Sequence, residues 1–535
     1  MAGTRLQIVG AFVLFAALAA PLAWHLTQVE RVPLPVERIQ MLSWSSSRFS
    51  GPVTFEVTLL SLQSDTINKS PTSNIPNVGY STQYVQSASQ LQLALKKSDG
   101  LHDTDDVLKS FLPDQKHQSF SIFLLCDDDA INTPILTVGK YRHAWSSACH
   151  VTEGDAVHSA IEKVIQNHVY PQLLSVSKTE DTKIARRALH YRLQFSVLKE
   201  NPSTEWEVEV ETLVQQYMGK MLHKIGAVAN FTVETQVVQY ARLAKEVTSN
   251  ADGTEFYLNA EELKQFKSMN DFLDVSVLDD REQVLHFMAA LPDPVHAPLF
   301  IRPDQQVTSK TALATSFELP GWGIAVILNP HALAKSSTKE RELQRVMGLF
   351  VTELRTLLGV PAFADRQREE DAANHGAPRR SLVFMPSPTD GIADWELDIV
   401  MRDRFTRIMQ TAIETLQSTV ELVEALPELS VLERVQQRVE TAVSRLESIL
   451  CERQQDCVAL SDLRSLLAMA RQASELTDAA YYDHTMIRQL YFPQEQMLGV
   501  YAPLLAPLIL PFLLGFVREF KRWKAKRAAK RSKQE

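Results

Sequence analysis

The sequence predicts a two-span membrane protein with a large lumenal mixed α/β domain followed by a helical subdomain. Three observations support this fold class. Each end of the 535-residue chain carries an uncharged apolar run, strand-like and helix-like segments alternate up to about residue 360, and the sequence is then almost free of glycine. We expect seven parts: a cytoplasmic N-terminus (1–5), a transmembrane helix (6–24), a lumenal mixed α/β region (25–360), a charged linker (361–390), a lumenal helical subdomain (391–496), a second transmembrane helix (497–517) and a basic cytoplasmic tail (518–535).

The first apolar run favours an uncleaved span. Leu6–Trp24 is 19 residues without a charge, which is longer than the apolar core of a secretory signal. Ala17–Ala19 resembles a cleavage site, so a cleaved signal peptide is the alternative.

Strands and helices of the mixed region follow from apolar periodicity. Alternating or continuous apolar runs predict strands, and apolar residues repeating at three and four positions predict helices. The polar stretch between about residues 62 and 118 gives no clear pattern. The predicted strands are Val53–Leu60, Ser121–Cys126, Pro134–Trp145, Tyr191–Leu198, Asn230–Tyr240 and Trp322–Leu328, and the predicted helices are Asp155–Leu173, Val210–Ile225 and Leu343–Leu358.

The segment after the linker predicts three helices. From Trp395 to Ala480, Leu, Glu, Gln and Arg recur at helical period. Breaks fall near Pro427 and between Cys451 and Cys457. These helices lead back to the membrane.

The second apolar run is long enough to cross a bilayer. It extends from Met497 to Val517, or 21 residues, and a spanning helix needs about 20. The tail beyond it has nine basic residues and two acidic ones, a net charge of +7. Basic flanks stay cytoplasmic, so both termini are expected there and residues 25–496 in the lumen. The glycosylation acceptors Asn68 and Asn230 fit a lumenal face.

Three prolines give the second span an unusual face. Pro503, Pro507 and Pro511 recur every fourth residue. Each lacks an N–H, so a carbonyl four residues earlier loses its helical partner, and the span has no Ser or Thr to replace it. Because unsatisfied carbonyls are costly in hydrocarbon, we predict that this face packs against a partner subunit. A lone, kinked anchor is the alternative.

Composition argues against nucleotide and nucleic-acid functions. The net charge is −9, and removing the tail (+7) and Arg5 (+1) leaves −17 on the lumenal part, whereas nucleic acid needs a basic face. Only 18 glycines occur, and no Gly-rich phosphate loop is present. We expect no nucleic-acid partner and no cofactor.

The four cysteines give two candidate local disulfides. Cys126 and Cys149 flank a predicted hairpin, and Cys451 and Cys457 lie between two predicted helices. Buried free thiols are the alternative. No Cys-x-x-Cys pair with zinc spacing occurs, so we expect no metal site.

One arrangement resembles a catalytic site. His102 lies 47 residues before Cys149, which follows an alanine, as in caspase-like proteases. A catalytic thiol also needs a base within reach and oxyanion donors. His102 lies in a polar segment, and no glycine follows Cys149 at the needed offset. We therefore name no catalytic residue.

Five stretches, in order, resemble the PIG-S family, a subunit of GPI transamidase. The resemblance covers nearly the whole chain, although the first 180 or so lumenal residues match faintly and the linker is longer and more charged. The stretches are ANFTVETQVVQYA (Ala229–Ala241), HAPLFI (His296–Ile301), PGWGIAVILN (Pro320–Asn329), DWELD (Asp394–Asp398) and the final span with its entry (Gln489–Phe520).

The resemblance implies an endoplasmic-reticulum membrane protein that is a non-catalytic subunit, supporting assembly and substrate presentation during GPI attachment. In that family the catalytic Cys and His belong to a separate caspase-like subunit, and the other implied partners are PIG-T, PIG-U and the multi-pass amide-forming subunit. Asn230 matches a family glycosylation position, and Asn68 has no clear counterpart. A membrane-anchored lumenal hydrolase and a membrane tether stay open as alternatives.

Overall fold

The computed structural model describes much of the chain, and its residues group into two units. One unit, here called the α/β unit, comprises Phe49–Ile408 and Arg453–Arg471, and the other, the helical unit, comprises Met1–Arg48, Met409–Glu452 and Gln472–Glu535. The described residues are 31–47, 55–62, 78–98, 100–113, 119–126, 135–148, 151, 155–165, 184–185, 188–203, 209–241, 243, 247–250, 252–259, 282–302, 313–329, 336–360, 382–426, 429–450, 463–486 and scattered positions from 503 to 527.

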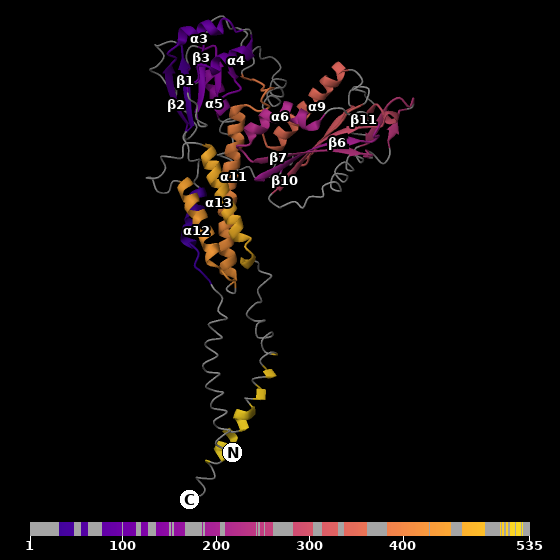
Figure 1. The fold of residues 1–535 in the computed structure, drawn as a ribbon. Helices are drawn as coiled ribbons and strands as arrows, with labels where there is room; N and C mark the ends of the chain where they lie inside the picture. Colours follow the sequence, from indigo (N-terminus) through magenta and orange to yellow (C-terminus); the bar gives the residue numbers. More distant parts are fainter. Residues whose placement is uncertain are drawn as a thin grey trace. The chain divides into compact units, whose positions relative to one another are not determined.

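The first sheet of the α/β unit has six strands in the order β14-β4-β5-β3-β1-β2, with helices beside it (Figure 1). All neighbours are parallel except β4 and β5, which form an antiparallel pair. The elements are β1 (Phe55–Ser61), β2 (Val78–Tyr84), α3 (Ala88–Leu95), α4 (Leu101–Lys109), β3 (Ser119–Leu124), β4 (Leu136–Val138), β5 (His143–Ser146), α5 (Ala156–Val164) and β14 (Leu382–Phe384).

Apolar side chains cover both faces of this sheet, as expected for parallel strands. One core joins Val57 and Ile122 to Ile161 of α5. The other joins Phe123 to Leu91 of α3 and Leu108 of α4. The sheet is therefore the middle of three layers.

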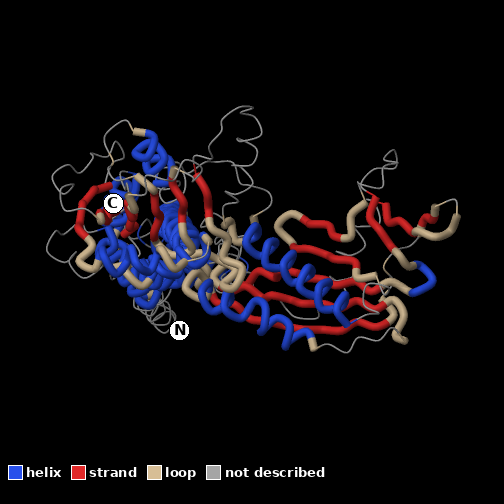
Figure 2. Tube along the Cα trace, turned by 90° about the horizontal axis from the view of Figure 1, so that it is seen from above, coloured by secondary structure: helices blue, strands red, loops and turns tan. Residues whose placement is uncertain are grey.

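The second sheet has five strands in the order β12-β13-β10-β6-β7, parallel except for β12. Helices α6 and α9 lie along it (Figure 2), where Phe350 of α9 packs on Phe195 and Phe287. The elements are β6 (His190–Lys199), α6 (Val210–Ile225), β7 (Asn230–Gln239), β10 (Glu282–Leu291), β12 (Ser316–Leu319), β13 (Gly323–Ile327) and α9 (Ser336–Leu357).

A small three-stranded sheet packs on the other face of the second sheet. Its order is β11-β9-β8, and Leu258 and Ile301 share a core with Met288 of β10. The 3₁₀ turn η3 precedes β11. These elements are β8 (Thr248–Ser249), β9 (Phe256–Asn259), η3 (Pro294–His296) and β11 (Leu299–Arg302).

The helical unit is a bundle built on an apolar stripe of α12, where Val435, Val439 and Leu446 are fully buried. Helix α2 packs on α12, and Arg38 donates two hydrogen bonds to the Glu447 carboxylate, at 2.8 and 2.7 Å. The elements are α2 (Val36–Ser47), the second half of α11 (Asp394–Ala425), α12 (Glu433–Leu450), the end of α13 (Leu463–Tyr481) and the 3₁₀ turn η6 (His484–Met486).

Among the described residues, no helix is both long enough and apolar enough to cross a bilayer. The first predicted span, 6–24, lies outside the described residues, and only scattered positions of 497–517 lie inside them.

Most predicted elements are confirmed, including the mixed α/β class, the helix Val210–Ile225 and the three helices after residue 390. Three differences have local causes. Pro134–Trp145 forms two strands, β4 and β5, because the chain turns between them. The stretch 62–118 contains the half-exposed strand β2 and the helices α3 and α4, which at 8 and 9 residues are too short to show a clear period. Strand β14 lies within the segment 361–390 that the sequence assigns to a linker.

Candidate functional site

The predicted modification sites lie partly within the described residues. Asn230 is exposed at the first position of β7, which is an edge strand of its sheet. Cys126 follows β3 with a positive φ of 54° and is half-buried. Asn68, Cys149, Cys451 and Cys457 lie outside the described residues, so both disulfides stay predictions.

Of the two residues that resemble a caspase-like site, the structure describes only His102. His102 is exposed on α4, and Cys149 lies outside the described residues. Three positions beyond His102, the same helix points Asp105 into the protein, where its side chain is fully buried. The polar sequence around His102 gave no signal for that burial.

Asp105 is the centre of a buried polar cluster. Its carboxylate accepts a hydrogen bond from the Lys140 backbone N–H at 3.1 Å. Lys140 Nζ lies 3.4 Å from Oδ2, and His143 Nε2 lies 3.2 Å from Oδ1. Gly139 makes room for these groups, because a Cβ there would lie 2.2 Å from Asp105 Oδ1. The cluster therefore links α4 to the β4–β5 turn through hydrogen bonds and ion pairs.

The electrostatics of the cluster keep Asp105 and Lys140 charged. Burial raises the pKa of Asp105, but His143 and the backbone and charge of Lys140 outweigh it, and the pKa is lowered. Burial lowers the pKa of Lys140, but Asp105 and Asp106 outweigh it, and the pKa is raised. Both charges are thus retained because they are paired.

An Asp–His pair is part of a catalytic triad, but no nucleophile contacts this pair within the part of the chain that the structure describes. The His143 ring stacks between Tyr141 and Trp145, at centroid distances of 6.0 and 5.9 Å. His143 Nδ1 has no hydrogen-bond partner among the described residues, so no described nucleophile engages it. The side chains of Asp105 and His143 are both 0% exposed. The geometry supports a structural role for the pair.

The first turn of α11 is a second polar cluster, here called the α11 junction (Asp394, Trp395, Glu396 and Asp398). Trp395 Nε1 donates to the carbonyl of Gly139 at 2.9 Å. Asp398 accepts a hydrogen bond from Arg142 Nη2 at 2.9 Å, as one arm of a two-armed ion pair. Both partners belong to the β4–β5 turn of the first sheet.

The other two junction residues contact helices of the second sheet. Asp394 lies 2.9 Å from Lys224 of α6. Glu396 pairs with Arg355 of α9 at 2.7 Å and accepts a hydrogen bond from the Ala393 N–H at 2.8 Å. The DWELD stretch thus ties both layered sheets of the α/β unit to one helix, and every polar side chain in it has a partner.

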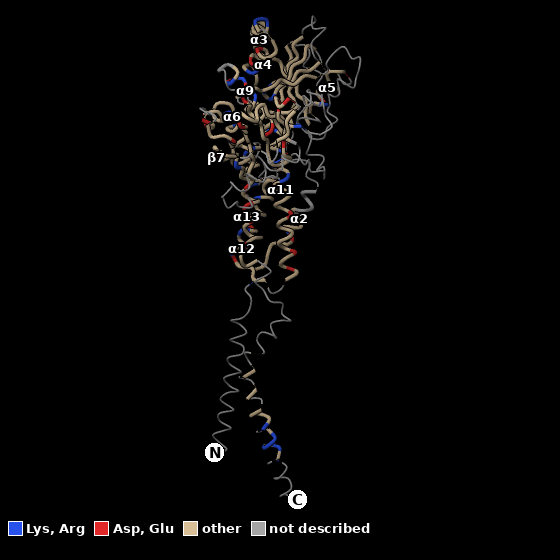
Figure 3. Tube along the Cα trace, turned by 90° about the vertical axis from the view of Figure 1, so that its right-hand side faces the viewer, with Lys and Arg blue, Asp and Glu red and all other residues tan. Residues whose placement is uncertain are grey.

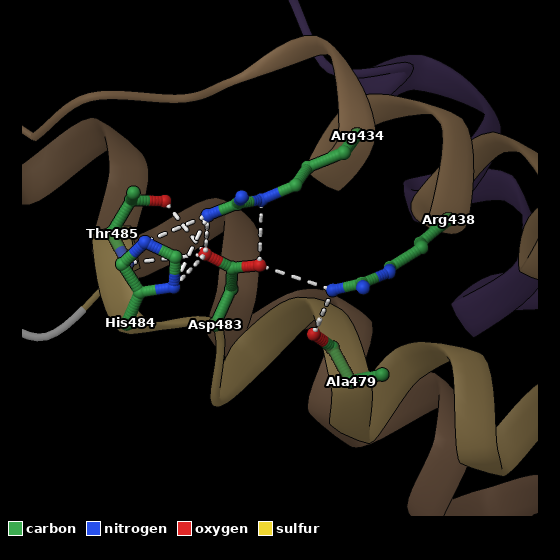
Figure 4. A network of polar contacts seen from close by, with 6 residues as sticks. All are labelled: Arg434, Arg438, Ala479, Asp483, His484 and Thr485. Carbon is green, nitrogen blue, oxygen red and sulfur yellow. Dashed lines mark hydrogen bonds and ion pairs between the residues drawn. The ribbon is translucent and has the colours of Figure 1, made fainter.

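A third polar cluster, in the helical unit, has Asp483 at its centre, just after α13 (Figure 4). Arg434 binds the carboxylate through two nitrogens, at 2.8 and 3.0 Å, and Arg438 Nη1 lies 3.0 Å away. The Thr485 N–H and hydroxyl donate at 3.1 and 2.9 Å. Burial raises the pKa of Asp483, but the hydrogen bonds from Arg434 and Thr485 and the charge of Arg434 outweigh it, and the pKa falls to about 2.

The proline face of the second predicted span is described only at separate positions. Pro503, Pro507 and Pro511 are helical and exposed. No partner chain is present, so packing of this face against another subunit stays a prediction.

The fold and its clusters define a large mixed α/β protein with a helical unit, in which several ion pairs, such as Arg142–Asp398 and Lys224–Asp394, join elements far apart in sequence. The family model "Phosphatidylinositol-glycan biosynthesis class S protein" (PIG-S) matches residues 10–526. The chain belongs to this family, and the resemblance seen in its sequence is confirmed.

Relatives match over most of the chain. A bovine protein named "GPI-anchor transamidase component PIGS" is 24% identical over 522 residues, 91% of this chain and 89% of the relative. The human protein of that name is 24% identical over 549 residues, 94% of each chain. A fission-yeast "GPI transamidase component PIG-S homolog" is 23% identical over 338 residues, 61% of this chain and 53% of the relative.

Proposed function

We propose that this chain is a non-catalytic subunit of the GPI transamidase complex, which attaches GPI anchors to proteins in the endoplasmic reticulum. One observation carries the proposal: the chain matches proteins named as components of that enzyme along 89–94% of their length. The role is assembly of the complex, with presentation of substrate as a further contribution.

The polar side chains described above take part in the fold itself. The Asp105–His143 pair is fully buried, and His102 lies on an exposed helix face. The junction side chains are engaged in ion pairs and hydrogen bonds within the fold. The partners proposed from the resemblance are a caspase-like catalytic subunit, PIG-T, PIG-U and the multi-pass amide-forming subunit.

Co-purification tests membership of the complex. The tagged full chain, isolated in mild detergent, should bring down the caspase-like subunit in stoichiometric amount, measured by quantitative mass spectrometry. Arg404→Ala serves as a control for folding. It removes a buried guanidinium that donates to the Tyr191 hydroxyl, so it should lower the amount of folded chain that is recovered. Recovery of the folded wild-type chain without transamidase components would contradict the proposal.

The proposed topology has two spans, 6–24 and 497–517, with both termini cytoplasmic and the bulk lumenal. The exposed Asn230 at the start of an edge strand supports glycan attachment there, and Asn68 is the second proposed site. Glycosidase treatment should lower the mass of the wild type by one more glycan than that of Asn230→Gln. Protease added to sealed vesicles should trim only the tail, and digestion of the bulk would contradict this orientation.

The exposed proline face is proposed to pack against partner helices. Replacing Pro503, Pro507 and Pro511 by Leu should leave insertion intact and lower co-purification of the partners. A triple variant that assembles at wild-type yield would show that this face is not an interface.

A further inference from the structure

A row of aromatic rings begins at the end of the second predicted span, at Phe516, and continues into the basic tail. Residues 514–518 and 520–525 are helical, and Phe516, Phe520 and Trp523 lie on one helix face because they are four and three positions apart. Their centroids are 6.4 and 6.0 Å apart, with interplanar angles of 16° and 30°. The Arg527 guanidinium lies 4.9 Å from the Trp523 ring. We call these three rings the aromatic ladder.

Basic side chains surround the ladder. From Arg518 to Arg527 the sequence holds six basic residues and one acid, Glu519, and Figure 3 shows the blue cluster near the C-terminus. Lys521 and Lys524 are exposed. Each ladder ring is itself 54% exposed, which is unusual for such large apolar groups in water.

We propose that the aromatic ladder and the basic residues around it form a binding surface for anionic phospholipid headgroups. Aromatic rings collect at the boundary between hydrocarbon and water, and basic residues beside a span are attracted to anionic leaflets. From Phe516 to Trp523 the helix rises about 10 Å, enough to extend from the edge of the hydrocarbon through one headgroup layer of about 5–7 Å. The rings lie at the boundary, and the Lys and Arg side chains reach the lipid phosphates.

The arrangement fits lipid better than nucleic acid. Single-stranded nucleic acid binds by stacking its bases on open aromatic faces. Here the rings lie nearly parallel to one another along the helix, and Arg527 covers Trp523. An uncharged run also leads directly into the ladder, which places it at a bilayer surface if the proposed second span is correct.

Photolabelling of the full chain tests the surface. The chain in proteoliposomes is exposed to phosphatidylserine or phosphatidylcholine with a photoreactive headgroup, and labelling of residues 514–527 is measured by mass spectrometry. The variant K521Q/R522Q/K524Q removes three charges beside the ladder. The matched control K530Q/R531Q/K533Q removes three charges farther along the same tail.

The wild type should be labelled by phosphatidylserine at least tenfold more than by phosphatidylcholine. Each basic residue near a surface contributes about fivefold to binding, so the first variant should need about 100-fold more phosphatidylserine and the control less than tenfold more. F520S/W523S should reduce labelling with all charges kept.

Equal labelling by the two lipids, or equal loss in the two charge variants, would overturn the proposal. Displacement of the lipid by a single-stranded oligonucleotide, with oligonucleotide binding that is lost in F520S/W523S, would assign the tail to nucleic acid and overturn it too. The proposal rests on the proposed second span, whose failure is seen separately, as release of the wild-type chain from membranes by alkaline carbonate.

Discussion

Replacing Asp105 by Ala tests the buried cluster of the α/β unit. The carboxylate is 0% exposed and lies within 3.4 Å of Lys140 Nζ, 3.2 Å of His143 Nε2 and 3.1 Å of the Lys140 backbone nitrogen. Its loss leaves the ammonium of Lys140, whose side chain is 14% exposed, without its inner partner. Breaking a buried pair in this way costs about 3–5 kcal/mol, and we expect that loss of unfolding free energy for the α/β unit.

The neighbouring Asp106 provides the matched control. It lies 3.5 Å from the same ammonium but is 61% exposed, and an exposed pair contributes about 0–1 kcal/mol. Pulse proteolysis across a urea series measures both variants in the full chain. Asp105→Ala should lower the midpoint by about 1 M or more at a slope of up to about 3 kcal/mol per M. A midpoint equal to that of Asp106→Ala would refute a stabilising role for the cluster.

Four further variants test other parts of the fold. Gly323→Ala should destabilise the second sheet by more than about 2 kcal/mol, because φ is +148° and a Cβ would lie 1.9 Å from the His286 carbonyl oxygen; Gly348→Ala, in a helix with open space, should stabilise by up to about 1 kcal/mol. Trp395→Phe should cost about 1–3 kcal/mol through the buried Gly139 carbonyl, and no change in urea midpoint would contradict the junction. Because the pKa of Asp483 is lowered to about 2 from 3.8, its stabilisation is present above pH 4 and is lost as the pH falls through 2; Asp483→Asn should remove that step from a plot of stability against pH.

Elements with a strong period could be predicted from sequence. The stripe from Val210 to Ile225 is helix α6 with its apolar side buried, and the alternation of β6 places Tyr191, Leu193 and Phe195 in the core. Strand β2 could not be predicted because it is an edge strand with half-exposed residues and no apolar alternation. The three residues of β14 are too few to show a period.

The polar clusters could be predicted even less well. Asp105 and Asp106 are adjacent residues of the same type, yet Asp105 is buried and Asp106 is exposed. Asp105 lies on the side of α4 that packs into the core with Leu108, and Asp106 lies on another side. The partners of Trp395 and Asp398 lie 256 residues earlier in the chain. Such pairings depend on the tertiary fold and cannot be predicted from the local sequence pattern. The DWELD stretch resembles the family, but its contacts with both sheets follow only from the tertiary structure.

The central claim is that this chain is required for GPI attachment without supplying the nucleophile. The most direct measurement is surface display of a GPI-anchored reporter, by flow cytometry, in cells that lack the chain and are given back the wild type or Cys149→Ser. Display should be lost without the chain and restored equally by both forms. Display that persists without the chain would contradict a role in the transamidase, and a Cys149→Ser chain that assembles with its partners but restores no display would show that it is catalytic.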